Sequence, residues 1–122
     1  MKINYELIAN GSQKEKKTEM EKFFNDLLKL NYEEQVESFK NLLINLAKDT
    51  DDKKYRDFCK VSMEVFLSLK NINLKNIMAT RLEAQFELPE EDRMVDSVNL
   101  LKAIEEMPQK DYLLSLIESI EK

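Results

Sequence analysis

The sequence predicts an all-α protein, a compact bundle of five to seven short amphipathic helices in antiparallel hairpins. Apolar residues recur at spacings of three and four along most of the chain, which is the period of a helix. Signatures of helix capping separate these segments from one another. The 122 residues include only one glycine and two prolines, too few for the turns of a multi-stranded sheet.

A chain of this length fits one compact domain, so residues 1–122 are expected to form a single helical domain. Hydrophobic residues make up 43% of it, which is enough to build a core and argues against intrinsic disorder. Alternate helix starts come at intervals that would also suit two-helix repeats, so the alternative architecture is a short α-solenoid of the HEAT or TPR kind. The expected starts are near residues 12, 31, 51, 73, 89 and 108.

A short helix and a long one are expected at the start of the chain. The short helix covers residues 3–9 and ends at a left-handed stop formed by the Asn10-Gly11 pair. Ser12 follows at once, with Glu15 three residues later, which is the arrangement of a capping box. The first long helix therefore starts at Ser12 and is expected to end near residue 30.

Two more long helices are expected in the middle of the chain. Asn31 with Glu34 repeats the capping box and opens the clearest amphipathic helix. Its apolar stripe is Tyr32, Val36, Phe39, Leu42, Leu43, Leu46 and Ala47. Asp51 or Asp52 caps the next helix, which ends near Lys70. This helix is apolar on several sides and must be covered on several sides, so we expect it to be the central and most buried one.

Three further helices complete the expected bundle. Asn73 caps a helix that ends near residue 87, because the residue before a proline is pushed out of the helical region. Pro89 suits the first turn of the following helix. Pro108 repeats this device before a last helix over residues 111–120.

The net negative charge of the chain falls in its second half. The net charge is −5, and the segment 83–121 carries eleven acidic against three basic residues, a net charge of −8. An acidic surface repels the phosphate backbone of nucleic acid and the anionic surface of a membrane. We therefore expect neither nucleic acid nor a membrane as a partner. A basic protein is the partner that this charge favours.

The composition excludes several kinds of chemistry. The chain has no histidine and one cysteine, which removes imidazole bases, Cys/His zinc sites, disulfide frameworks and Ser-His-Asp triads. Cys59 lies on an apolar helix face, where a thiol acts as a small buried hydrophobe. We expect no catalytic residue, metal site or cofactor. A lone thiol, with no leader-like segment before it, is typical of a cytoplasmic protein.

Arg81 and Gln85 are the most informative polar residues. In helical projection both fall near the centre of the apolar sector of the helix that Asn73 caps. That sector is formed by Leu74, Ile77, Met78, Leu82 and Phe86. Buried arginine is costly unless it is paired, so a carboxylate from another helix is expected to meet Arg81. In the alternative, Arg81 and Gln85 line an open site for an anion, a carboxylate ligand or a partner peptide.

These observations favour a non-enzymatic interaction or adaptor module, acting alone or as a homodimer, with an acidic C-terminal half. Glu90, Glu91 and Asp92 are its candidate contacts for a basic partner. A small-anion sensor or enzyme subunit using Arg81 and Gln85 is one alternative, and a structural subunit of a larger assembly is another. The later helices each carry one methionine, which suits either core filling or an adaptable binding surface. These are Met63, Met78, Met94 and Met107.

Overall fold

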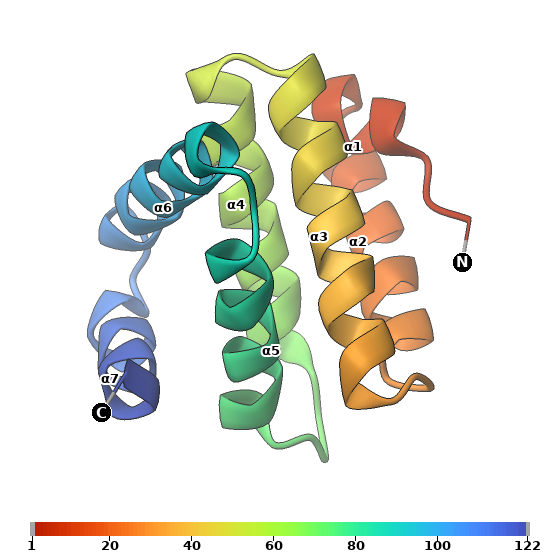
Figure 1. Cartoon of the computed structure of the whole chain (residues 1–122). Helices are drawn as coiled ribbons and strands as arrows, with labels where there is room; N and C mark the ends of the chain where they lie inside the picture. The colour runs from red at the N-terminus through yellow and green to blue at the C-terminus, as the bar shows by residue number, and fades with distance from the viewer. Residues whose placement is uncertain (1, 122) are drawn as a thin grey trace.

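The structure is a computed structural model that describes residues 2–121. Within this range it contains seven helices and no strand, which confirms the expected all-α bundle (Figure 1). The helices are α1 (Tyr5–Asn10), α2 (Gln13–Leu27), α3 (Tyr32–Asp49), α4 (Asp52–Ser68), α5 (Leu74–Phe86), α6 (Glu90–Glu105) and α7 (Lys110–Glu121). None of these helices is both long enough and apolar enough to cross a lipid bilayer.

Side chains cap α2, α3, α4 and α5 where the sequence predicts. At the start of α2, the Ser12 backbone N–H donates to Glu15 Oε1 at 2.8 Å, and the Glu15 N–H donates to Ser12 Oγ at 3.2 Å. Asn31 and Glu34 form the same reciprocal pair before α3. Each cap satisfies backbone donors that the first turn of a helix leaves without a partner. The N-cap residues of the first five helices are Asn4, Ser12, Asn31, Asp51 and Asn73.

The expected left-handed stop after α1 is wrong. Gly11 has an extended backbone, with φ of −73°, and its N–H donates to the Leu7 carbonyl at 2.9 Å. A Cβ at this position would lie only 2.5 Å from that carbonyl oxygen. Glycine is therefore needed here for the close approach of two backbone segments, and not for a positive φ.

Helix α2 is one turn shorter than expected. It ends at Leu27, and the Leu30 N–H bonds the Leu27 carbonyl at 3.0 Å in a tighter turn. The side chain of Gln35 in α3 then donates to the carbonyls of Leu27 and Leu30 at 3.1 and 3.3 Å. A tertiary contact from α3 thus closes α2, which the local sequence of α2 could not reveal.

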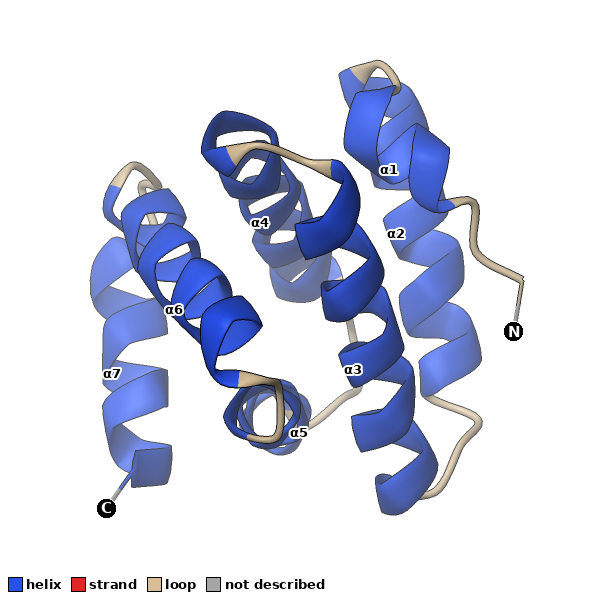
Figure 2. Ribbon diagram, turned by 45° about the horizontal axis from the view of Figure 1, so that its top comes forward, coloured by secondary structure: helices blue, strands red, loops and turns tan. Residues whose placement is uncertain are grey.

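The three most extensive helix contacts join helices two apart in the sequence. α2 packs on α4, α3 on α5, and α4 on α6. In space, α1 and α2 lie on one side of the bundle, α6 and α7 on the other, and the remaining three between them (Figures 1 and 2). Stacked helix pairs produce second-neighbour packing of this kind, so the bundle shares that feature with the solenoid alternative.

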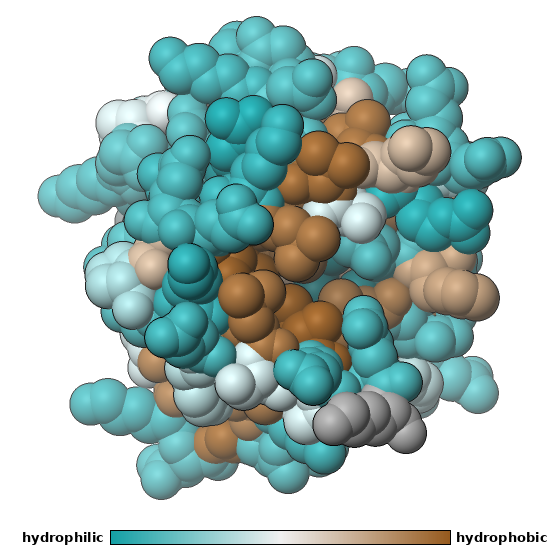
Figure 3. All heavy atoms as spheres, turned by 90° about the vertical axis from the view of Figure 1, so that its left-hand side faces the viewer, coloured by the Kyte–Doolittle hydropathy of each residue, from teal (hydrophilic) through white to brown (hydrophobic). Residues whose placement is uncertain are grey.

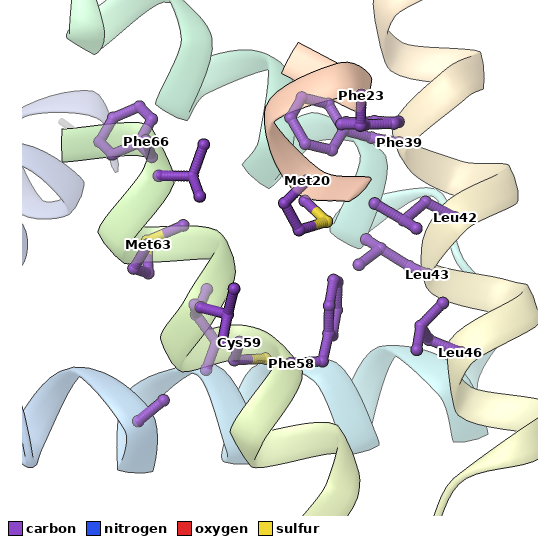
Figure 4. Close-up of a cluster of buried hydrophobic side chains, with 14 of the residues drawn as sticks. Met20, Phe23, Phe39, Leu42, Leu43, Leu46, Phe58, Cys59, Met63 and Phe66 are labelled. Atoms are coloured by element: carbon purple, nitrogen blue, oxygen red, sulfur yellow. The ribbon is translucent and has the colours of Figure 1, made fainter. Parts of the chain in front are cut away.

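Helix α4 is the central helix, as expected. More of its residues are buried than those of any other helix in the range 2–121. They are Tyr55, Phe58, Cys59, Val61, Ser62, Met63, Val65 and Phe66. Figure 4 shows its side chains facing those of α2 and α3 across the core. Phenylalanine rings link the layers: the ring centroids of Phe23 and Phe39 lie 5.2 Å apart, and those of Phe24 and Phe66 lie 6.5 Å apart.

Two aromatic residues expected in apolar stripes are instead exposed. Tyr32 is 56% exposed and Phe86 is 70% exposed. Tyr32 is the first residue of α3 and Phe86 the last of α5, where a helix end can extend beyond its neighbours. The buried face of α5 is instead Ile77, Met78, Thr80, Arg81 and Ala84.

Truncation of Phe66 tests the central position of α4. Phe66 is 1% exposed, so Phe66→Ala should lower the free energy of unfolding by about 3 to 5 kcal/mol through lost burial and the cavity left behind. Phe86→Ala is the matched control and should change it by less than about 0.5 kcal/mol. Urea melts measure both. A loss under about 1 kcal/mol for Phe66→Ala would contradict the assigned core.

Candidate functional site

Arg81 lies in a buried ion pair with Asp96, which comes from α6. Arg81 Nη1 donates to Asp96 Oδ2 at 2.6 Å, and Nη2 donates to Asp96 Oδ1 at 2.7 Å. The side chains of Arg81 and Asp96 are 3% and 0% exposed. The two parallel hydrogen bonds are the geometry that a planar guanidinium prefers with a carboxylate. The cross-helix carboxylate expected from the sequence is therefore Asp96.

Two more side chains complete the hydrogen bonding of Asp96. Gln85 Nε2 donates to Asp96 Oδ2 at 2.8 Å, and the Tyr55 hydroxyl of α4 donates to Oδ1 at 2.6 Å. The carboxylate thus accepts four hydrogen bonds, about as many as its two oxygens can take. This buried cluster (Tyr55, Arg81, Gln85 and Asp96) joins α4, α5 and α6.

The cluster keeps its three titratable members, Tyr55, Arg81 and Asp96, in fixed protonation states near neutral pH. Burial by itself would raise the pKa of Asp96, but the charge of Arg81 and the hydrogen bonds from its neighbours outweigh burial. The pKa of Asp96 therefore lies below its ordinary value. Burial and the nearby carboxylate raise the pKa of Tyr55, so its phenol stays protonated and donates.

Cys59 lies beside this cluster and is itself fully buried. Burial raises the pKa of the Cys59 thiol, and the negative charge of Asp96 raises it further. Since the thiolate is the reactive form, these surroundings keep Cys59 unreactive. This agrees with its expected role as a small hydrophobe.

The polar groups of the buried cluster bind one another and are therefore not available to a ligand. Both Nη atoms of Arg81 are already bonded to Asp96, and so is the amide nitrogen of Gln85. An anion that took these three donors would have to displace the Asp96 carboxylate and leave it buried without its charged partner, which is strongly unfavourable. This geometry does not favour the alternative of an open anion site at Arg81 and Gln85.

A second polar contact ties α6 to the start of α4. Asn99 Nδ2 donates to Asp52 Oδ1 at 3.1 Å and to the Val95 carbonyl at 3.0 Å. Asn99 and Asp96 are three residues apart and both are buried, so they share the inner face of α6. The polar contacts of Asp96 and Asn99 therefore fix the rotation of α6 about its axis.

The acidic candidates lie elsewhere, on the surface of α6. Glu90 and Glu91 are exposed and Asp92 is half-buried, all in the first turn of α6. They form the first turn of a helix whose N-cap, Pro89, makes no side-chain hydrogen bond, and their charges complement the dipole of α6. The structure therefore does not gather the five candidate residues into one site.

An apolar stripe on the outer face of α6 was missed by the sequence reasoning. Met94, Val98 and Leu101 are 59%, 44% and 44% exposed, and their spacings of four and three place them on one helix face. We call these three residues the outer stripe. Figure 3 views the side of the molecule formed by α6 and α7, where a hydrophobic area is surrounded by hydrophilic side chains.

The signal for this stripe was present in the sequence. α6 carries apolar residues on two opposite faces, since Leu100, Ala103 and Ile104 are buried while the outer stripe is exposed. Of the four later methionines, Met63, Met78 and Met107 fill the core, and Met94 alone lies on the surface. A helix with two apolar faces needs a partner on each.

Comparisons with protein-family models, curated proteins and solved structures found no match to this chain. Among residues 2–121, no three carboxylate or thiol side chains are placed to hold a metal ion.

A double-mutant cycle tests the pairing of Arg81 with Asp96. Arg81→Met should lower the free energy of unfolding by about 3 to 5 kcal/mol, because it strands a buried carboxylate. Arg81→Met with Asp96→Leu should cost less than the sum of the two single changes. Lys102→Met, on the exposed side of α6, is the control and should change stability by less than about 0.5 kcal/mol. Additive single effects would argue against the pair.

Asp96 should also contribute to the loss of stability in acid. Above the ordinary aspartate pKa of about 4, Asp96 is ionised in both the folded and the unfolded chain, and its contribution is complete. Below that pH the unfolded chain takes up the proton first, because the pKa of Asp96 is lowered in the fold. Stability then falls until the pH passes the native pKa of Asp96.

Urea melts of the wild type and Asp96→Asn across this pH range measure that contribution. The wild type should lose more stability in acid than the variant, whose amide does not titrate. If Asp96→Asn does not fold, the carboxyl carbon of Asp96 can be titrated by NMR in the wild type. A native pKa at or above the ordinary value would contradict the assignment.

Proposed function

We propose that this chain is a non-enzymatic protein interaction module that binds a basic partner protein through the outer face of α6. The observation that carries the proposal is the outer stripe, which lies between exposed glutamates at both of its ends. Glu90 and Glu91 precede it, and Glu105 follows it. An exposed apolar stripe with a polar rim is typical of a protein contact surface.

The charge of this region supports a basic partner. The segment 83–121 has a net charge of −8, and Asp96 is withdrawn from the surface by Arg81. Glu106 is also engaged, by Lys60 of α4 at 2.7 Å. The glutamates around the outer stripe are therefore the groups that a basic partner would meet. Their field would speed its approach and slow that of acidic proteins.

The buried cluster supports a non-enzymatic function for this chain. Its carboxylate is saturated by four donors, and the neighbouring Cys59 thiol is held in its neutral form. A catalytic group needs a pKa matched to its reaction and access to a substrate. The buried cluster has neither feature, because its pKa shifts and its hydrogen bonds stabilise the fold. This favours binding, rather than catalysis, as the role of the chain.

Association kinetics test the proposed function. The immobilised chain is used to capture proteins from a cell lysate, and the association rate of each purified partner is measured from ~0.05 to ~0.5 M salt. A basic partner should associate more slowly as salt rises. Glu90→Lys with Glu91→Lys should slow association about tenfold at low salt, because the steering field is reversed.

A control with the same change in net charge is available. Glu21→Lys with Glu33→Lys places the new charges on exposed positions of α2 and α3. This pair should slow association far less than the α6 pair if the outer face of α6 is the contact. Salt-independent association, or equal effects of the two pairs, would refute the proposed function.

A further inference from the structure

We infer that the outer stripe receives an amphipathic helix that lies antiparallel to α6 and carries basic residues in its last turn. This inference rests on the proposed function and specifies the kind of partner. It follows from the spacing of the stripe, from the placing of the charges around it and from the direction of α6.

The outer stripe has the size and shape of a helix-packing surface. Met94 and Leu101 are seven residues apart, so the stripe is about 10 Å long, or two helical turns. Residues at this spacing form a ridge that packs between the side chains of a second helix. A partner with apolar residues at positions i, i+3 or i+4, and i+7 would cover the stripe. The flexible thioether of Met94 allows that surface to adapt to the partner.

A second copy of this chain is a poor occupant of the stripe. In a twofold dimer each stripe would cover its own equivalent, and the two α6 helices would be either antiparallel or parallel. The glutamates at the start of one helix would then lie beside Glu105 at the end of the other in the first case, and beside their own equivalents in the second. Lys102 is the exposed base on this helix, against Glu90, Glu91 and Glu105. The repulsion of like charges therefore favours a partner of opposite charge.

The charges also set the direction of the partner helix. Glu90 and Glu91 form an acidic end to the outer stripe, whereas Lys102 offsets Glu105 at the other end. Lysine and arginine are most favourable in the last turn of a helix, where they complement its dipole. An antiparallel helix brings that last turn beside Glu90 and Glu91. The helix dipoles are then also opposed, which is their favourable arrangement.

Two designed peptides of about 15 residues, long enough to span from Glu90 to Glu105, test this inference. Both carry leucine at the spacing of the outer stripe and have blocked ends. One has its lysines in the last turn and the other has them in the first turn. The first peptide should bind more tightly by about fivefold or more, as measured by fluorescence anisotropy, and should gain helix by circular dichroism.

Matched variants locate the binding on the chain. Val98→Ser with Leu101→Ser should weaken binding by about tenfold or more, because both side chains belong to the outer stripe. Tyr32→Ser with Phe86→Ser removes exposed aromatic surface elsewhere and should change binding by less than about twofold. A nitroxide on the carboxyl end of the peptide should broaden amide signals near Glu90, as the antiparallel direction requires.

Several outcomes would overturn the inference. They are equal binding of the two peptides, broadening near Glu105, equal effects of the two pairs of variants, and no binding by either peptide at ~1 mM. A dimer of the free chain that Val98→Ser with Leu101→Ser dissociates would show that a second copy covers the stripe. In each case the proposed function still stands if salt-dependent association with a captured partner is sensitive to Glu90 and Glu91. Loss of that dependence refutes the proposed function itself.

Discussion

The ion pair between Arg81 and Asp96 determines how α6 is oriented on α4 and α5. Its two hydrogen bonds join α5 to α6, and the Tyr55 hydroxyl extends the contact to α4. An apolar cluster of similar volume could give equal or greater stability, because the free-energy cost of desolvating two charges offsets most of their attraction. What an apolar cluster could not give is a single rotation of α6. Turning α6 by one residue, about 100°, would carry Asp96 off the inner face and leave the Arg81 guanidinium buried without its partner.

This constraint matters because hydrophobicity alone does not orient α6. The inner residues Leu100, Ala103 and Ile104 and the outer stripe are both apolar, so burial of either face would remove hydrophobic surface from water. Asp96 and Asn99 lie on the inner face and have their polar partners on α4 and α5. The polar contacts therefore select which apolar face is buried, and the outer stripe is exposed as a consequence. The buried cluster therefore also shapes the surface, because it holds α6 in the rotation that exposes the proposed contact residues.

Local features of the fold could be predicted from the sequence, and long-range ones could not. Ser12 and Asn31 start their helices through contacts three residues away, so the sequence shows them directly. The need of Arg81 for a carboxylate was also visible, because the helical projection placed it among apolar residues. The identity of that carboxylate depends on the packing of α5 against α6, which no local pattern contains. The prediction that Phe86 lies in the core is wrong for a similar reason, since burial at a helix end depends on how far the neighbouring helices extend.

The outer stripe and its glutamates make physical sense only together. An apolar stripe alone on the surface would promote self-association and aggregation. Glutamates at both ends oppose that outcome, because every copy carries the same charges, and they leave an oppositely charged partner unhindered. Glu90 and Glu91 also stabilise the first turn of α6, so a contact surface of this kind adds little cost to the fold. One short segment, residues 90–105, thus combines a buried face that fixes its orientation with an exposed face whose charges restrict what can cover it.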